Sequence, residues 1–349
     1  MTWTNERETL RALAATIGAG AVIVAVSTAA QGQPAAAVRT LGTIERADPR
    51  FDRLIPTGAT LEVLADGYKW VEGPVWDRKG GRILFSDIPN NSVFEWTEAG
   101  GAKLFLKPSG YLGAAPFTGR EPGSNGLAFD REGRLVLCQH GERRVVRREA
   151  DGRFTALADR FEGKRFNSPN DLVFSSRGDL YFTDPPYGLP KTFDDPAREM
   201  PWQGVYRLSR EGRLSLLVKD LRAPNGVALS PDEKTLYVAQ SDRARAVVMA
   251  YDLAADGAVA NARVFFDMTP WTSKGPGLPD GIKVDRAGNV FSTGPRGVHA
   301  FTPEGVLLGS LVTGVPTANL AFGEDGSTLY VTANTALCRV RTATRGLGF

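Results

Sequence analysis

The stretch NDLVFSSRGDLYFTDP, residues 170–185, decides the fold of this chain. Two short apolar runs flank a polar turn that contains Gly178. This pattern is typical of two antiparallel strands joined by a tight turn, and it does not fit the 3.6-residue period of a helix. Residues 170–185 therefore predict a β-hairpin.

The same hairpin pattern occurs six times along the chain. The other five copies read EGPVWDRKGGRILFSD (72–87), NGLAFDREGRLVLCQH (125–140), NGVALSPDEKTLYVAQ (225–240), DGIKVDRAGNVFSTGP (280–295) and ANLAFGEDGSTLYVTA (318–333). A second pair of strands follows the hairpins, as in VYRLS and then LSLLVKD. Four strands per repeat, at spacings of roughly 40 to 55 residues, are the signature of a β-propeller blade.

The last repeat stops one strand short, at LCRVRT, whereas LEVLA (61–65) precedes the first repeat and resembles an outermost strand. We therefore predict an all-β fold, a six-bladed β-propeller closed by an N-terminal strand that completes the last blade. Such closure removes the exposed edges of an open sheet.

Composition excludes several classes of protein. The 349 residues carry a formal net charge of +3, with 42% hydrophobic and 23% charged residues, so neither wholesale disorder nor a nucleic-acid partner is indicated. The two cysteines, Cys138 and Cys338, have no zinc-motif spacing, and we expect them to be unpaired. A small molecule is the expected partner, bound by a monomer or a dimer.

The N-terminus has a different composition. An apolar run at residues 12–26 follows Arg7 and Arg11, and small residues come after it. This pattern favours a signal peptide over residues 1–30, with an uncleaved anchor or a buried helix as alternatives. We expect an exported protein, periplasmic or secreted, that has no membrane contact after cleavage. Residues 31–55 read as a linker or N-terminal extension, and 56–349 as the catalytic propeller domain.

The first residue of each repeat is expected at one mouth of the central channel. These residues are Glu72, Asn125, Asn170, Asn225, Asp280 and Ala318. Five of the six carry oxygen donors, the ligands that a hard cation such as Ca²⁺ prefers. The alternative is that Asn-Gly and Asp-Gly recur because every blade needs the same turn. Glu72 counts against that alternative, since Glu is not a favoured turn residue.

The segments VEGPVW, NSPNDL, TDPPYGL, PNG and LPDG resemble the SMP-30/gluconolactonase/LRE-like family, in particular its bacterial gluconolactonase branch. The resemblance runs from about residue 55 to the C-terminus. It implies one divalent cation in the channel, Ca²⁺ first, with Zn²⁺, Mg²⁺ and Mn²⁺ as alternatives. By position, the implied metal ligands are Glu72, Asn170, Asn225 and Asp280.

The resemblance implies a metal-dependent lactonase that hydrolyses glucono-1,5-lactone to gluconate by water attack on a polarised carbonyl. We expect Asp280 to be the general base, with Asp171 as the alternative, and His140 to act in acid–base work. The expected substrate contacts are Asn125, Asp171, His140, Tyr187 and Arg296. A phosphotriesterase or arylesterase on the same propeller, and a ligand-binding propeller without activity, remain the alternatives.

Overall fold

The computed structural model describes residues 38–349, which form one compact unit. The predicted signal peptide, residues 1–30, lies outside the described residues, as does the first part of the predicted linker. Within the described range, no helix combines the length and the apolar character needed to cross a membrane.

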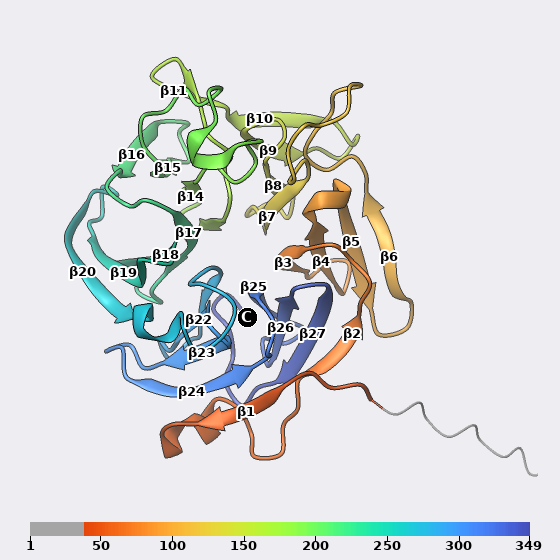
Figure 1. Ribbon diagram of the computed structural model, residues 1–349, viewed down its shortest axis with the longest axis vertical. Coiled ribbons are helices and arrows are strands. Elements are labelled where there is room, and N and C mark those ends of the chain that lie inside the picture. Colours follow the sequence, from red (N-terminus) through yellow and green to blue (C-terminus); the bar gives the residue numbers. More distant parts are fainter. Residues whose placement is uncertain (1–37) are drawn as a thin grey trace, which may run out of the picture. The chain divides into compact units, whose positions relative to one another are not determined.

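Six antiparallel sheets surround a central channel, which confirms the predicted six-bladed β-propeller (Figure 1). Each of the first three blades holds four strands that follow one another in the chain from the channel outward. Blade 1 contains β3 (Val71–Asp77), β4 (Arg82–Asp87), β5 (Ser92–Thr97) and β6 (Gly101–Leu106). Blade 2 contains β7 (Ser124–Phe129), β8 (Leu135–Gln139), β9 (Arg144–Arg148) and β10 (Phe154–Ala158). Blade 3 contains β13 (Leu172–Phe174), β14 (Leu180–Asp184), β15 (Gly204–Leu208) and β16 (Leu214–Val218).

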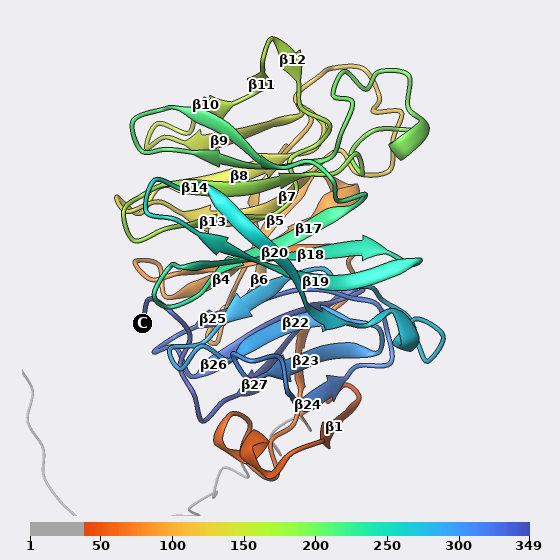
Figure 2. The same cartoon turned by 90° about the vertical axis from the view of Figure 1, so that its left-hand side faces the viewer.

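Blades 4 and 5 continue this order, and the strands stack side by side in Figure 2. Blade 4 contains β17 (Pro224–Leu229), β18 (Thr235–Asp242), β19 (Arg245–Leu253) and β20 (Val259–Asp267). Blade 5 contains β21 (Ile282–Val284), β22 (Val290–Gly294), β23 (Gly297–Phe301) and β24 (Leu307–Val312). A two-stranded ribbon, β11 (Arg160–Phe161) with β12 (Lys164–Arg165), projects between blades 2 and 3. The remaining short elements are the 3₁₀ turns η2 (Ile88–Asn90), η3 (Thr192–Asp194) and η4 (Thr269–Trp271).

Blade 6 combines strands from both ends of the described chain. Three of its strands are consecutive: β25 (Thr317–Gly323), β26 (Thr328–Ala333) and β27 (Ala336–Arg341). The outermost strand is β2 (Glu62–Ala65), which pairs antiparallel with β27 in the register Glu62↔Arg339 and Val63↔Cys338. Strand β27 is therefore paired along both of its edges, so it does not present the row of unpaired N–H and C=O groups that an edge strand has.

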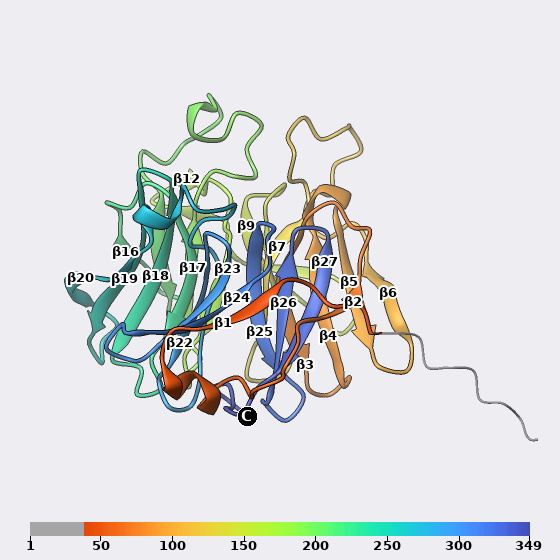
Figure 3. The ribbon, with the colours of Figure 1, turned by 60° about the horizontal axis from the view of Figure 1, so that its bottom comes forward.

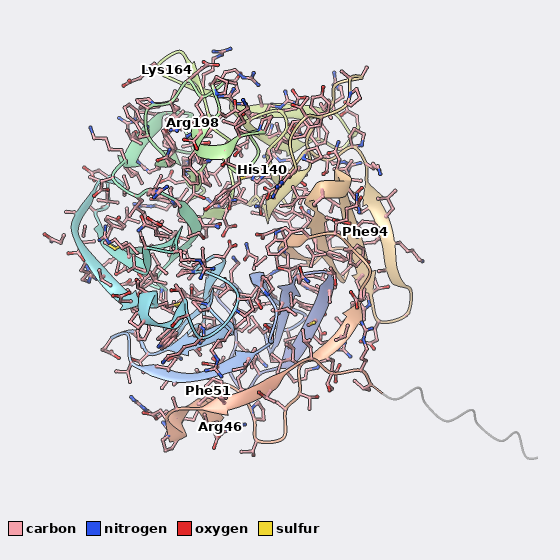
Figure 4. All side chains as sticks on the ribbon, in the orientation of Figure 1. Arg46, Phe51, Phe94, His140, Lys164 and Arg198 are labelled. Atoms are coloured by element: carbon pink, nitrogen blue, oxygen red, sulfur yellow. The ribbon has the colours of Figure 1, made fainter. Side chains whose placement is uncertain are left out.

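The described part of the predicted extension is folded onto the propeller. Strand β1 (Thr43–Arg46) pairs with β24 and becomes a fifth strand of blade 5. The 3₁₀ helix η1 (Pro49–Arg53) follows and buries Phe51 in the core between blades 5 and 6. Arg46 and Phe51 lie beside blade 5 in Figure 4. The linker prediction missed this strand because a four-residue strand gives too short a pattern to detect.

Aromatic and aliphatic side chains fill the spaces between blades. Between blades 2 and 3, for example, Phe166 packs edge-on against Phe182 and Tyr206, with ring centroids 5.3 and 5.0 Å apart. Burying one such side chain contributes about 2 kcal/mol, and edge-to-face pairs add to it. Cys138 and Cys338 are buried in these cores and unpaired, as predicted.

Glycines let the inner strands approach one another around the channel. The N–H of Gly126 donates to the carbonyl of Asn170 at 2.8 Å, and the N–H of Gly226 donates to the carbonyl of Asp280 at 3.1 Å. A Cβ atom at Gly226 would collide with that carbonyl of Asp280. The Asn-Gly and Asp-Gly pairs therefore recur because neighbouring blades touch here, and the turn explanation does not account for them.

Candidate metal and substrate site

One mouth of the channel opens into a polar cavity of about 330 Å³. Five of the six repeat-initial residues line it: Glu72, Asn125, Asn170, Asn225 and Asp280. Glu72, Asn125 and Asn225 are each the second residue of an inner strand. Asn170 and Asp280 lie two residues before the inner strands of their blades. The structure therefore brings together the four predicted metal ligands and the predicted substrate contact Asn125. The sixth position, Ala318, has no polar side chain to offer.

Several oxygens of this ring lack a hydrogen-bond partner although they are buried. They are Oδ1 of Asn125, Oδ1 of Asn225 and Oδ1 of Asp280. The amide of Asn225 is oriented by its own Nδ2, which donates to Oγ of Ser241 at 2.9 Å. Buried polar atoms nearly always have partners in native proteins, so three orphaned oxygens in one cavity require an explanation. A hard cation that takes oxygen ligands fits them.

The two carboxylates of the ring are electrostatically costly without a counter-charge. Burial raises the pKa of Glu72, and the nearby carboxylates of Asp171 and Glu121 raise it further. Burial likewise raises the pKa of Asp280 well above its usual range, and Glu72 adds to this effect. A divalent cation carries the two positive charges that would offset Glu72 and Asp280.

The amide oxygens are essential to this cation site. Over residues 38–349, no three His, Cys, Asp or Glu side chains come close enough together to hold a metal by themselves. A site made of Glu72, Asp280 and asparagine oxygens has no sulfur or imidazole, which favours Ca²⁺ or Mg²⁺ chemistry over a zinc site.

Asp171, predicted as an alternative base and as a substrate contact, lies just outside the cavity lining. Its Oδ1 accepts the N–H of Leu172 at 2.9 Å, and its Oδ2 is 4.0 Å from Nζ of Lys283. The carboxylate is almost fully buried, and both of its oxygens already face partners. Asp171 therefore belongs to a layer beneath the ring, where it does not reach a substrate.

His140, predicted for acid–base work and substrate binding, is fully buried behind the cavity wall. In Figure 4 it lies inside the ring, near β7 and the loop that carries η3. Its Nδ1 is 2.9 Å from Oε2 of Glu121, and Glu121, not His140, lines the cavity. His140 therefore does not line the cavity, whereas its neighbour Glu121 does.

The other two predicted substrate contacts have different outcomes. Tyr187 lines the cavity, and burial raises the pKa of its hydroxyl. Arg296 lies elsewhere: it lines a separate cavity of about 260 Å³, and its Nη2 donates to Oε1 of Glu45 at 2.6 Å. The prediction missed this because β1, which carries Glu45, was not expected and supplies the carboxylate that holds Arg296.

Sequence reasoning overlooked several side chains of the cavity. They are Trp70, Glu121, Ser241 and Arg243. Trp70 stands two residues before Glu72, so its position could have been inferred from the strand that follows. Glu121 ends the long loop 107–123, which has no repeat pattern and gave no signal.

The profile of the SMP-30/gluconolactonase/LRE-like region matches residues 70–335. The chain is 42% identical over 313 residues to a gluconolactonase of Zymomonas mobilis, covering 88% of each chain. It is 30% identical over 267 residues to the pentonolactonase XacC of Haloferax volcanii, covering 75% of this chain and 80% of the other.

A solved structure gives the same answer. The gluconolactonase of Xanthomonas campestris superposes with a TM-score of 0.76 at 32% identity, covering 89% of this chain and 99% of that one. The segments that form the ring lie within residues 70–335, which the family profile matches. This chain therefore belongs to the SMP-30/gluconolactonase/LRE-like family.

Proposed function

We propose that this protein is a divalent-cation-dependent lactonase, a carboxylic-ester hydrolase that opens a sugar lactone such as glucono-1,5-lactone to the free acid. The observation that carries the cation is the ring of oxygen donors with three orphaned oxygens in one cavity. The relatives named gluconolactonase and pentonolactonase support the lactone class. Ca²⁺ is the proposed cation because the ring offers only oxygen donors.

The residues that would hold the cation are Glu72, Asn170, Asn225 and Asp280. When bound, a divalent cation supplies a Lewis acid for the lactone carbonyl and lowers the pKa of water. Asn125 lies in the same wall and can donate its amide N–H to the substrate, which fixes the orientation of the lactone ring.

The proton of the attacking water needs an acceptor in the cavity. Asp280 lines the cavity and has an oxygen without a hydrogen-bond partner, whereas Asp171 is already engaged beneath the ring. We therefore assign the general-base role to Asp280. The water oxygen bonds to the carbonyl carbon, the ring C–O bond breaks, and the leaving oxygen takes up a proton to give the hydroxy acid.

We also propose that the protein works outside the cytoplasm, because residues 1–30 have the pattern of a signal peptide. Appearance of a mature form that begins near residue 31 in the extracytoplasmic fraction would test this. A full-length chain retained in the cytoplasm would contradict it.

The function is tested by hydrolysis of glucono-1,5-lactone, paraoxon and phenyl acetate before and after treatment with EDTA. We expect lactone turnover that EDTA abolishes and added Ca²⁺ restores. Turnover of only the phosphotriester or the aryl ester would instead identify the esterase alternative. Lactone turnover that resists EDTA, with no metal in the protein by elemental analysis, would overturn the cation-dependent mechanism.

A further inference from the structure

Glu121 is a third carboxylate on the wall of the cavity, separate from the ring of repeat-initial residues. It lines the same cavity as Glu72 and Asp280, and 27% of its side chain is exposed. The two ring carboxylates already match the two charges of a divalent cation. Glu121 is therefore not needed to neutralise the cation, and its place on the cavity wall needs another explanation.

The backbone two residues after Glu121 is fixed by hydrogen bonds. The N–H of Gly123 donates to the carbonyl of Ile88 at 3.0 Å, and the N–H of His140 donates to the carbonyl of Gly123 at 3.1 Å. Strand β7, with Asn125 in the cavity wall, begins directly after this anchor. Glu121 lies in a loop, but only three residues before the rigid inner strand of blade 2, and this strand fixes the position of its backbone.

The side chain of Glu121 also faces the buried imidazole of His140. Nδ1 of His140 is 2.9 Å from Oε2 of Glu121, and the imidazole is fully buried. The contact has the length of a hydrogen bond but not its angle, and both imidazole nitrogens are otherwise without a partner. Among the residues that the structure describes, Glu121 is the carboxylate that this buried imidazole faces. One oxygen of Glu121 therefore lies against the buried imidazole, while the partly exposed carboxylate also lines the cavity, where a ligand can reach it.

An ionised carboxylate only accepts hydrogen bonds, so its ligand must be a donor. Hydroxyl groups are the donors that a sugar lactone carries around its ring. The aromatic side chains of Trp70 and Tyr187 line the same cavity and suit the apolar C–H face of such a ring. A simple ester or an unsubstituted lactone would leave Glu121 unpaired on binding, which is a penalty against those substrates.

We propose that Glu121 is the residue that selects polyhydroxylated lactones, by accepting hydrogen bonds from ring hydroxyls, and that His140 is its positioning residue. This inference rests on the proposed lactonase function and specifies which lactones the site accepts.

The test compares two lactones and one ring that cannot react. Glucono-1,5-lactone carries hydroxyls, δ-valerolactone has the same ring size without them, and 1,5-anhydroglucitol keeps the hydroxyls but lacks the carbonyl. We expect Glu121→Ala to lower kcat/KM for glucono-1,5-lactone by roughly 10-fold to 100-fold, mainly through KM. The same variant should change the value for δ-valerolactone by less than about threefold, since no hydroxyl contact is lost.

Calorimetry with 1,5-anhydroglucitol gives a readout that needs no turnover. Its affinity should fall by the same factor in Glu121→Ala, and less in Glu121→Gln, which keeps one acceptor oxygen. His140→Asn should reduce the preference for glucono-1,5-lactone over δ-valerolactone in the same direction but by a smaller factor, with the melting temperature as a check on folding.

The control variant is Glu142→Gln. This carboxylate lies near the same loop, accepts the N–H of Leu112 at 3.0 Å and does not line the cavity, so removing its charge should alter neither the preference nor the binding.

Equal losses on both lactones, or unchanged binding of 1,5-anhydroglucitol in Glu121→Ala, would overturn the role of Glu121. Failure of the wild-type protein to hydrolyse any lactone would overturn the proposed function instead. Binding of 1,5-anhydroglucitol would then still decide whether Glu121 contacts hydroxyl groups.

Discussion

The two ends of the central channel are built by the same six inner strands and have opposite chemistry. At the mouth stand the first residues of the repeats, polar in five blades out of six. At the other end lies a cavity of about 520 Å³. Its walls include the residues four positions further along each strand: Trp76, Phe129, Phe174, Leu229, Val284 and Phe322. The start of each repeat therefore lines the polar mouth, and the residue four positions later lines the apolar cavity at the other end.

The far end is partly filled by the C-terminal residues of the chain. Leu347, Gly348 and Phe349 line the apolar cavity, and Figure 3 shows the C-terminus on the side opposite the long loops over the mouth. The guanidinium of Arg78 lies 4.1 Å from the ring centroid of Phe349 and also donates to the carbonyl of Gly348. The mouth is left open for a ligand, whereas the chain itself covers the far end. The unpaired buried polar groups at the mouth thus lower stability but serve function, whereas the apolar packing at the far end contributes to stability.

The largest effect should come from removing a charge at the mouth. We expect Asp280→Asn to lower lactone turnover by roughly 10³-fold, because a cation ligand and the general base are lost together. The same variant should melt at an equal or higher temperature without metal, since a buried carboxylate with a raised pKa no longer has to be accommodated. A lactone hydrolysis assay measures the first effect, and calorimetric melting with and without Ca²⁺ measures the second. A lower melting temperature of the metal-free variant would break the proposed contrast between the two ends.

A buried histidine that belongs to neither end of the channel should affect how the free energy of unfolding changes at acid pH. His299 in β23 is buried, with Nδ1 2.8 Å from Oγ of Ser310 and Nε2 2.8 Å from the carbonyl of Pro295. Burial lowers the pKa of His299 to about 4, and Arg296 lowers it further, while Pro295 and Glu45 oppose the shift. Between about pH 6.5 and 4, His299 is therefore protonated in the unfolded chain but neutral in the folded chain.

His299 alone should accordingly remove about 3 kcal/mol of stability as the pH drops from 6.5 to 4, with no further loss from this group below pH 4, whereas Glu72 and Asp280, whose pKa values are raised, act in the opposite direction. Urea unfolding of the metal-free protein across this range measures the loss. His299→Gln should flatten the slope. An unchanged slope in that variant would show that His299 does not contribute to the acid response.

The smallest effect is expected at the far end. Deleting residues 347–349 should lower the free energy of unfolding by about 2 kcal/mol, because the partly buried Leu347 and Phe349 and the contact with Arg78 are lost. Activity should stay within about twofold, since the tail is remote from the cavity that holds the ring. Denaturant unfolding and kcat on one preparation test both parts. A large loss of activity at unchanged stability would show that the two ends are coupled.

The repeat and the ring of polar residues at the mouth follow from the sequence alone. Six hairpin patterns such as 170–185 are local, and their period-2 spacing specifies strands whatever surrounds them. Once the repeats are aligned, the symmetry of a propeller brings Glu72, Asn170, Asn225 and Asp280 to one mouth, so their convergence follows without knowledge of any loop.

Only the tertiary structure decided which other side chains reach the cavity. Glu121 comes from a loop without a repeat, and its place depends on His140, Ile88 and Gly123, which are distant or irregular in sequence. Asp171 faces Lys283, which belongs to another blade. Arg296 is paired with Glu45, which lies on a strand that the sequence did not reveal. Strand positions are fixed by local alternation of residues, but loop side chains are placed by long-range contacts, and those exist only after the blades have assembled.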